Sequence, residues 1–473
     1  MESRIDDLDA WVAEMMAREQ IPGLSLAVVQ NGNIVKVGHY GLANVELNVP
    51  VNEETSFKIA SMSKAFTAAA LMLLVEDGSV GLDDRVTSHL EGLPSTWDDI
   101  TLRQLANHTS GMSNDWDLHP GGPRPDDWTN NSSDYFLQNT TDEAFLSALT
   151  GLPLLFAPGE RSSYAAGTFV IGMVIERVSG MPYAEFMRTR IFEPLGMTRT
   201  IINDAARVVP HRASGYRLHR GELMNGWRIS QAAEARGDVG VMTTALDMAK
   251  WDAAMRDTRL LSQASLDEIA TPARLNDGGS YPDGLGWSLW PIRGFHTMGH
   301  GGGFRTGFSS IIYRFMDGDL TVIIVSNLWN VVFTFTDAQE IASFFDPTFQ
   351  RISTMQPRTD PDPDRSNILR NVIGLVASGI VNPTYMTENF LIDAYNLTPW
   401  QERHEGLESF SFVDCQPRGS RGVASDGSVV SEVCFYSFTE PQGTGYLVFS
   451  LTDDGRVADL YADELKAHPT DSM

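Results

Sequence analysis

Hydrophobic and polar positions recur with different periods along this 473-residue chain, and each period predicts a kind of element. Apolar side chains at helical spacing over residues 4–19 predict a first helix. Two β-rich runs then flank Asn31-Gly32, a dipeptide typical of a tight hairpin turn. A further helix is predicted to begin near Ser61 and to end at Asp77-Gly78, because glycine commonly ends a helix.

The middle of the chain is mainly helical, and β-rich runs predominate from residue 285 to residue 326. Helical periodicity marks residues 168–179 and 182–192. β-rich runs follow at 285–290, 307–315 and 320–326. Because strands at both ends of this region enclose the helices, we expect an α+β fold in which helices flank an antiparallel sheet. We expect this first domain to span residues 1–350.

A stretch rich in proline and aspartate follows the first domain. Proline removes backbone donors and neighbouring carboxylates repel, so residues 351–366 are predicted to form a stiff, hydrated linker. A helical pattern and then several β-rich runs predict a small α+β accessory domain over residues 367–473. The β-rich runs are at 409–415, 428–437, 444–451 and 457–461.

Charge and composition exclude some classes of partner. The 61 acidic and 35 basic residues give a net charge of −26, which would repel nucleic acid and anionic membrane surfaces. No apolar run reaches the roughly 20 residues that cross a bilayer. The acidic N-terminal segment does not resemble a signal peptide, so we expect a cytoplasmic protein. Cys415 and Cys434 could pair across a hairpin, but in that compartment we expect reduced thiols.

The candidate chemistry begins with Ser61 and Lys64. The chain has five lysines against thirty arginines, and lysine, unlike arginine, can lose its proton inside a protein. A spacing of three places both side chains on one helical face, where a desolvated amine could take the serine proton. Taken alone, the pattern also fits a surface helix that carries two polar residues.

Short motifs recur along the first domain in a fixed order. They are SFKIASMSKAFT at 56–67, LRQLANHTSGM at 102–112, PGERSSY at 158–164, EPLGM at 193–197, VMTTALDMAKW at 241–251, LGW at 285–287 and HGG at 300–302. Together they resemble the class C β-lactamase-like family, which includes penicillin-binding proteins and related esterases, acyltransferases and thioesterases. The resemblance runs from about residue 8 to 330 and implies the β-lactamase fold.

The resemblance also implies an acyl-enzyme mechanism. Ser61 would attack a carbonyl, and Lys64 and Tyr164 would share the transfer of its proton. The backbone N–H groups of Ser61 and Gly303 would form the oxyanion hole, which stabilises the charge that develops in the transition state. Tyr164 could instead be a core tyrosine whose hydroxyl has an ordinary partner.

His300 and Gly302 would line this site on an edge strand, where glycine lets a substrate approach the backbone closely. A histidine in a glycine-rich turn is the alternative interpretation of His300. In the family, the stretch that contains His108 is mainly structural, so we expect no chemistry from His108.

Two positions depart from the family pattern. Ala166 stands where an asparagine commonly offers its amide to the substrate's acyl-amide group, and alanine has neither donor nor acceptor. His300 stands where a lysine would bind a β-lactam carboxylate, although Arg305 lies near enough in sequence to replace it. Both changes favour ester or thioester substrates over β-lactams and D-peptides.

Residues 113–142 form a loop that is too long for a plain connection. Its Trp116 and Trp128 could bind an apolar acyl group or could pack the loop against the body of the protein. The sequence contains no phosphate-binding loop, no Gly-x-Ser-x-Gly elbow and no His-Glu-x-x-His zinc motif. We therefore expect neither a metal nor another cofactor.

The sequence predicts a serine hydrolase or acyltransferase that acts on an ester, thioester or amide through acyl-Ser61, with secondary-metabolite biosynthesis as one setting. Its partner would be a small acyl substrate, free or bound to a carrier, and the oligomeric state does not follow from the sequence. A D-amino-acid peptidase or weak β-lactamase is the alternative within this class. A non-catalytic binding protein of the same fold is the alternative from another class.

Overall fold

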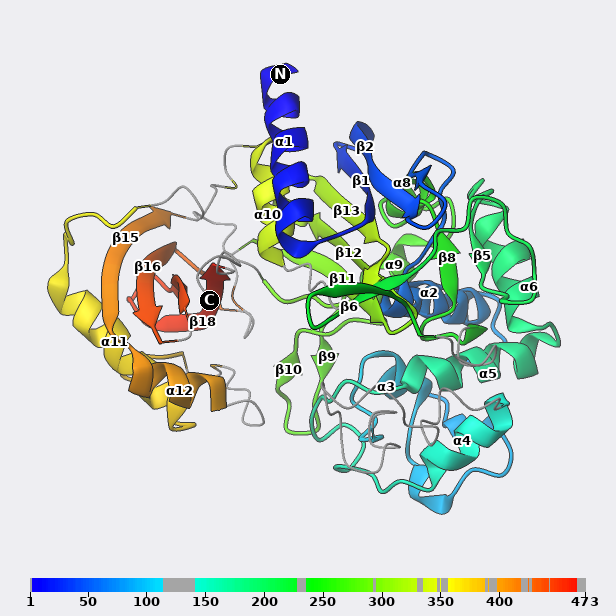
Figure 1. Ribbon diagram of the computed structural model, residues 1–473. Coiled ribbons are helices and arrows are strands. Elements are labelled where there is room, and N and C mark those ends of the chain that lie inside the picture. The colour runs from blue at the N-terminus through cyan, green and yellow to red at the C-terminus, as the bar shows by residue number, and fades with distance from the viewer. Residues whose placement is uncertain are drawn as a thin grey trace. The chain divides into compact units, whose positions relative to one another are not determined.

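The computed structural model is shown in Figure 1. It describes residues 2–113, 141–227, 235–291, 295–329, 335–346, 349, 356–387, 390, 398–417, 424, 428–441 and 443–465. The chain divides into two compact units. The first unit comprises Met1–Ser288, Met298–Arg314 and Asp319–Thr334, and the second comprises Leu289–Thr297, Phe315–Gly318 and Phe335–Met473.

A six-stranded sheet forms the centre of the first unit. Its strands are β1 (Gly23–Gln30), β2 (Asn33–Asn44), β3 (Val49–Pro50), β11 (Thr297–Phe304), β12 (Phe308–Phe315) and β13 (Leu320–Ser326). They lie in the order β11-β12-β13-β1-β2-β3, so β11 is an edge strand. β1 pairs antiparallel with β2 and β13, and the β1–β2 hairpin turns at Asn31-Gly32 as predicted. Both of these turn residues have positive φ, which asparagine and glycine tolerate.

Helices cover this sheet and form a separate helical region. The helices of the first unit are α1 (Glu2–Glu19), α2 (Ser63–Glu76), α3 (Leu102–Ala106), α4 (Asp142–Thr150), α5 (Gly167–Ser179), α6 (Tyr183–Met187), α8 (Ala245–Ala254) and α9 (Gln263–Ile269). α8 packs on β1 and β13, and β1 is buried from Gly23 to Val29 rather than on alternate residues. α2 is buried on nearly every side and packs against α5, and it ends just before Gly78.

Three small sheets complete the first unit. The first has the order β4-β8-β5, the second β14-β6-β7 and the third β10-β9. Their strands are β4 (Phe57–Lys58), β5 (Ile201–Ile202), β6 (Tyr216–His219), β7 (Glu222–Asn225), β8 (Val241–Thr243), β9 (Ala273–Arg274), β10 (Ser280–Tyr281) and β14 (Leu328–Trp329). β4 leads directly into the segment that carries Ser61, so its pairing with β8 fixes the start of that segment.

The second unit has its own sheet and core. Its elements are α10 (Phe335–Ser343), α11 (Pro363–Ala377), α12 (Thr398–Gly406), β15 (Ser409–Pro417), β16 (Glu432–Glu440), β17 (Gly443–Leu451) and β18 (Val457–Leu465). The four strands pair antiparallel in chain order, as the β-rich runs predicted. Val372 and Ile373 of α11 pack with Phe449 of β17 in a buried apolar cluster. Both units mix helices with antiparallel sheets, which confirms the α+β class.

One predicted strand is wrong. Residues 285–290 form no strand, and of these residues only Ser288 takes part in isolated bridges, because Gly286 turns the chain with a positive φ of 69° close to the Lys64 carbonyl. Helix α11 begins at Pro363, within the stretch expected to be a linker. Asp362 caps that helix by accepting a hydrogen bond from the Arg365 N–H, and proline suits the first helical position. The expected domain boundaries at residues 350 and 367 stay a prediction.

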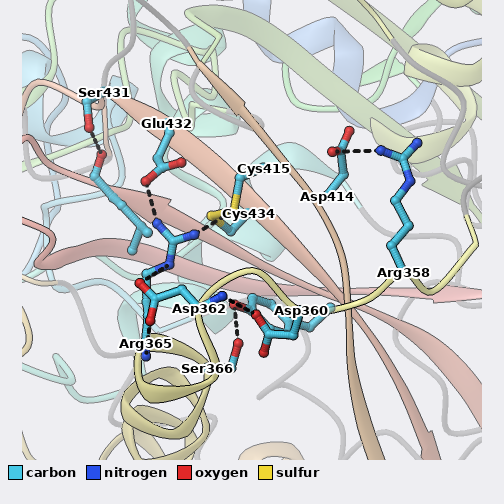
Figure 2. The surroundings of a disulfide bond; sticks show 12 residues. Arg358, Asp360, Asp362, Arg365, Ser366, Asp414, Cys415, Ser431, Glu432 and Cys434 are labelled. Carbon is cyan, nitrogen blue, oxygen red and sulfur yellow. Dashed lines mark hydrogen bonds and ion pairs between the residues drawn. A yellow bond between two sulfur atoms is a disulfide. The ribbon is translucent and has the colours of Figure 1, made fainter.

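The expectation of reduced thiols is also wrong, because Cys415 and Cys434 form a disulfide (Figure 2). The two cysteines face each other across β15 and β16, with 4.1 Å between their Cα atoms. The Arg365 guanidinium lies beside them and pairs with Glu432 at 2.8 Å. None of the helices in the described ranges has the length and apolar character needed to cross a membrane.

Candidate active site

Ser61 lies in a single 3-10 turn, Ala60–Met62, that leads into α2. Ala60 has a positive φ of 49°, which is unfavourable for a residue with a Cβ and costs about 1–3 kcal/mol. Such strain persists only where the surrounding structure imposes it, and it is common at functional sites. The Ile59 carbonyl on the other side of Ala60 accepts a hydrogen bond from the Ser310 hydroxyl at 2.9 Å, which fixes this segment against β12.

Lys64 places its amine next to the Ser61 hydroxyl. The two residues are one helical turn apart, and 3.3 Å separates Lys64 Nζ from Ser61 Oγ. The same amine donates a hydrogen bond to the Asp238 backbone carbonyl at 3.3 Å. The Lys64 side chain is buried, so its charged form loses hydration and the amine is suited to exchange a proton with Ser61.

Tyr164 forms another wall of this site. The Lys64 Nζ lies 4.8 Å from the centroid of its ring, and 43% of the residue is exposed. The His108 ring packs against Tyr164 with a centroid distance of 4.6 Å, and the His300 ring lies 6.4 Å from it. An exposed tyrosine held between an amine and two imidazoles differs from the core tyrosine that was the alternative interpretation.

His108 positions the segment that carries Tyr164. Its backbone carbonyl accepts a hydrogen bond from Ser163 N at 2.9 Å, and its Nδ1 accepts one from Ala165 N at 3.3 Å. These two bonds hold the residues on either side of Tyr164. The sequence interpretation, which gave His108 no chemistry, agrees with this supporting place in the fold.

Both histidines of the site are neutral over the physiological range. Burial and the nearby Lys64 and His300 lower the pKa of His108 to about 3. Burial and Lys64 also lower the pKa of His300 to about 4. The site therefore presents one amine and two neutral imidazoles rather than several competing cations.

β11 brings the third motif alongside the Ser61 segment. A Cβ added to Gly302 would come within 2.1 Å of the Ile59 carbonyl oxygen, so the two backbones meet there as only glycine allows. A Cβ added to Gly303 would meet no atom within 4 Å, so space lies beside this position. The expected place of the Gly303 N–H in an oxyanion hole stays a prediction.

The structure brings together Ser61, Lys64, Tyr164 and His300, with Gly302 and Gly303 on the adjoining edge strand. Arg305, expected to bind a substrate carboxylate, follows β11 and is only 5% exposed. Its proposed role stays a prediction. Trp116 and Trp128 lie outside the described residues.

One contact in this site was absent from the sequence interpretation. The Asp238 carbonyl is a partner of Lys64 although it lies 174 residues away in the chain. The Asp238 carboxylate pairs with Arg236, and both side chains are almost fully buried. The Val241 N–H bonds to the Ser63 hydroxyl at 2.9 Å and ties the same segment to α2. The only available signal was the nearby motif at 241–251, since a backbone contact leaves no residue-type signature.

Within the described ranges, potential metal ligands gather only at Cys415, Glu432 and Cys434, and the two sulfurs are already joined to each other.

Residues 8–344 match the Beta-lactamase family. The chain belongs to this family. It is 30% identical over 331 residues to penicillin-binding protein 4* of Bacillus subtilis strain 168, a match that covers 66% of this chain and 69% of that protein. The chain is also 29% identical over 327 residues to a D-aminopeptidase of Gluconobacter oxydans, covering 68% of this chain and 58% of that protein.

The fold is shared with the hydrolase EstCE1, described as having promiscuous acyltransferase activity. The TM-score is 0.59 at 20% identity, and the match covers 70% of this chain and 94% of that one. These comparisons confirm the family resemblance and the fold that the motifs predicted. The protein is a member of the serine hydrolases of the β-lactamase and penicillin-binding-protein type.

Proposed function

We propose that this protein hydrolyses or transfers the acyl group of an ester or thioester through a covalent intermediate on Ser61. The observation that supports this most directly is the buried Lys64 amine, 3.3 Å from the Ser61 hydroxyl. A nucleophile and a base within hydrogen-bond reach are the basic requirement of such chemistry. The family membership supports the same class of reaction.

In the first half of the reaction, Ser61 Oγ bonds to the substrate's carbonyl carbon as its proton passes to Lys64 in the amine form. The Tyr164 hydroxyl would share this proton transfer, and the ring of this residue lies 4.8 Å from the same amine. The tetrahedral oxyanion accepts hydrogen bonds from the N–H groups of Ser61 and Gly303. The intermediate then breaks its bond to the alcohol or thiol, which leaves with the proton, and acyl-Ser61 remains. In the second half, water or another acceptor gives up a proton to the amine and bonds to the acyl carbon. The bond between that carbon and Ser61 Oγ then breaks, and Oγ takes the proton back, which restores the hydroxyl.

Ala166 supports the preference for esters and thioesters. It lies at the N-terminal cap of α5, buried to 3% exposure, and its methyl group can offer no hydrogen bond. An amide substrate would lose a partner there, whereas an ester lacks the N–H that needs one. His300, neutral at physiological pH, likewise offers no permanent charge to a β-lactam carboxylate.

A D-amino-acid peptidase is the second candidate, favoured by the D-aminopeptidase relative. Parallel assays with an ester and with the D-amino-acid p-nitroanilide of the same acyl group separate the two. We expect the ratio of kcat/KM for the ester to kcat/KM for the anilide to exceed the ratio of their uncatalysed hydrolysis rates in water by at least about 100-fold. A preference for the anilide would establish the peptidase instead.

The acyl substrate is proposed to be a small molecule, free or bound to a carrier, in a biosynthetic setting. Transfer of a thioester-bound acyl group to an added acceptor, with little product in its absence, would support transfer over hydrolysis. The cytoplasm remains the proposed location, although a disulfide is more typical of oxidising compartments.

Replacing Lys64 by methionine tests the proposed base. Methionine keeps the length of the buried side chain and removes the amine, so we expect ester turnover to fall by roughly 10²–10⁴-fold. Lys36→Met is the matched control. Lys36 lies on β2, which three strands separate from β11 in the sheet, and it pairs with Asp9 of α1. Equal activity of the two variants would rule out Lys64 as the base.

A further inference from the structure

An acidic residue supplies the backbone carbonyl that accepts a hydrogen bond from Lys64. This contact joins Lys64 Nζ to the main-chain oxygen of Asp238 at 3.3 Å. The carboxylate of the same residue pairs with Arg236 instead, at 3.3 Å from Asp238 Oδ1 to Arg236 Nε and 3.4 Å from Oδ2 to Nη2. Only one methylene group joins this carboxylate to the backbone that contacts Lys64, so a change of side-chain rotamer would bring it within reach of the amine.

A carboxylate in contact with Lys64 would impair the proposed base. Opposite charges attract strongly inside a protein, where the effective dielectric constant is low. The Asp238 carboxylate beside the Lys64 ammonium would therefore raise the pKa of the amine, and a protonated amine cannot take the serine proton. The uncharged Asp238 carbonyl orients the same amine without adding a negative charge next to it.

Arg236 is anchored where it holds this carboxylate. The side chains of the pair are almost fully buried, with 2% of Arg236 and 5% of Asp238 exposed. The Arg236 guanidinium lies 4.0 Å from the centre of the Phe145 ring on α4 and 5.4 Å from that of the Phe169 ring on α5. A desolvated guanidinium is stabilised by such ring contacts. Two helices therefore fix the cation with which the carboxylate pairs.

The backbone next to Asp238 is held by separate contacts. The Gly237 carbonyl accepts a hydrogen bond from the Thr67 hydroxyl of α2. A Cβ added to Gly237 would lie 2.7 Å from the Thr168 carbonyl oxygen of α5, so the chain passes α5 more closely than a side chain would allow. These contacts keep the Asp238 carbonyl near Lys64 and do not involve the Asp238 side chain.

We propose that Arg236 is a positioning residue that keeps the Asp238 carboxylate away from Lys64, so that Lys64 can act as a base near neutral pH. This inference rests on the proposed function for the role of Lys64 and on the buried ion pair for the role of Arg236. The carbonyl of Asp238 orients the amine, and Arg236 withholds the charge of the same residue.

Other titratable groups surround Lys64 and the ion pair. They include Tyr164, His108 and His300 beside Lys64, and Asp142, Glu143, Glu176 and Tyr183 around Arg236 and Asp238. Burial raises the pKa of Asp142 to about 6, and the charge of Arg236 opposes this rise. The loss of Arg236 would therefore raise the pKa of Asp142 further, so the test needs a second change that acts on Asp238 alone.

Replacing Arg236 by methionine, with and without Asp238→Asn, tests this role. For Arg236→Met, we expect ester turnover at pH 7 to fall at least about tenfold and to recover at alkaline pH, since the freed carboxylate holds Lys64 protonated. Arg236→Gln should shift in the same direction. Arg236→Met/Asp238→Asn should restore the wild-type pH profile and leaves no unpaired charge in the interior. Arg256→Met, which removes the partner of the buried Asp252 on α8, is the matched control and should leave the profile unchanged.

A direct titration of Lys64 makes the test independent of turnover. The chain has only five lysines, so ¹³C NMR of protein labelled at lysine Cε gives few signals, and Lys64→Met identifies the one from Lys64. We expect Lys64 to titrate at least about one pH unit higher in Arg236→Met than in the wild type, and to return in Arg236→Met/Asp238→Asn. An unchanged midpoint in Arg236→Met, or one that stays high in the double variant, would overturn the inference. Failure of the proposed function would show instead as no ester turnover by the wild type.

Discussion

At the scale of single residues, the proposed chemistry depends on the surroundings of one amine. Lys64 touches the Ser61 hydroxyl, the Asp238 carbonyl and the face of the Tyr164 ring. The imidazoles of His108 and His300 stay neutral, because burial and Lys64 itself lower their pKa values. The Lys64 amine is therefore the basic group of this site that lies beside the Ser61 hydroxyl.

The low pKa of His108 predicts a pH-dependent stability. Above about pH 6.5 the imidazole is neutral in both states and contributes nothing. As the pH falls from 6.5 towards 3, the unfolded chain binds a proton that the folded protein refuses, so the free energy of unfolding decreases. In that pH range this residue lowers the free energy of unfolding by about 1.4 kcal/mol per pH unit.

His108→Asn tests this slope, since asparagine tolerates the positive φ of 63° at this position. We expect denaturant unfolding to show a weaker loss of stability between pH 6.5 and 4 in the variant than in the wild type. The comparison is needed because other groups titrate there, such as Asp283, whose pKa burial raises to about 7. Parallel curves for the two proteins would contradict a neutral buried His108.

Residue spacing predicted part of the site. Ser61 and Lys64 lie on one helical turn, so local geometry alone was enough to bring them together. The Asp238 carbonyl was not predictable, because a backbone acceptor has no residue-type signature and reaches Lys64 only through the tertiary fold. Arg305 was placed by its closeness in sequence, which gives no information on the burial of its side chain.

At the scale of elements, the edge strand β11 sets the distance between the third motif and the nucleophile. Gly302 lies against Ile59, whereas Gly301 has only the Ser310 carbonyl, at 4.0 Å, near the position of an added Cβ. A close backbone contact therefore excludes a side chain at Gly302 but not at Gly301. The sequence showed a run of glycines and could not tell them apart.

A pair of alanine variants separates these two glycines. Gly302→Ala must push β11 away from the Ser61 segment, so we expect a stability loss of roughly 2 kcal/mol and a large loss of ester turnover. Gly301→Ala should melt within a few degrees of the wild type. Thermal unfolding and the ester assay measure both effects, and a Gly302→Ala protein that melts and turns over like the wild type would contradict the close approach.

The sequence interpretation left a Cys415–Cys434 pairing across a hairpin open and expected reduced thiols only because of the expected compartment, whereas strand register shows how the pair forms. The pairing of β15 with β16 shifts by one residue between Phe412 and Asp414, and this irregularity brings Cys415 opposite Cys434. In a regular ladder continued from Phe412, Cys415 would face Val433 instead. A bulge of this kind cannot be located from alternation of residue types, although the four strands themselves were predicted.

The disulfide should stabilise the second unit. It joins residues 19 apart in sequence, and closing a loop of that size in the unfolded chain is worth about 3 kcal/mol. We expect dithiothreitol to lower the melting temperature of the wild type. Cys415→Ser should melt at the lower temperature with or without the reductant. If the reductant does not change the wild-type curve, the bond does not contribute to stability.

At the scale of the whole molecule, the two units carry different kinds of information. The first unit contains all the family motifs and the candidate site, and its fold was predictable because ordered motifs constrain topology. The second unit was predictable as an α+β fold from its strand pattern alone. A net charge of −26 gives the chain a negative field that would repel anionic partners.

The central claim, that Ser61 is an acylated nucleophile, is tested most directly by intact-protein mass after exposure to a fluorophosphonate. We expect one added phosphonyl group on the wild type and none on Ser61→Ala, with turnover of a short p-nitrophenyl ester lost in the same variant. Equal labelling of both proteins, or ester turnover that survives in Ser61→Ala, would contradict the acyl-Ser61 mechanism. A wild type that is neither labelled nor active on the ester would favour a binding protein of the same fold.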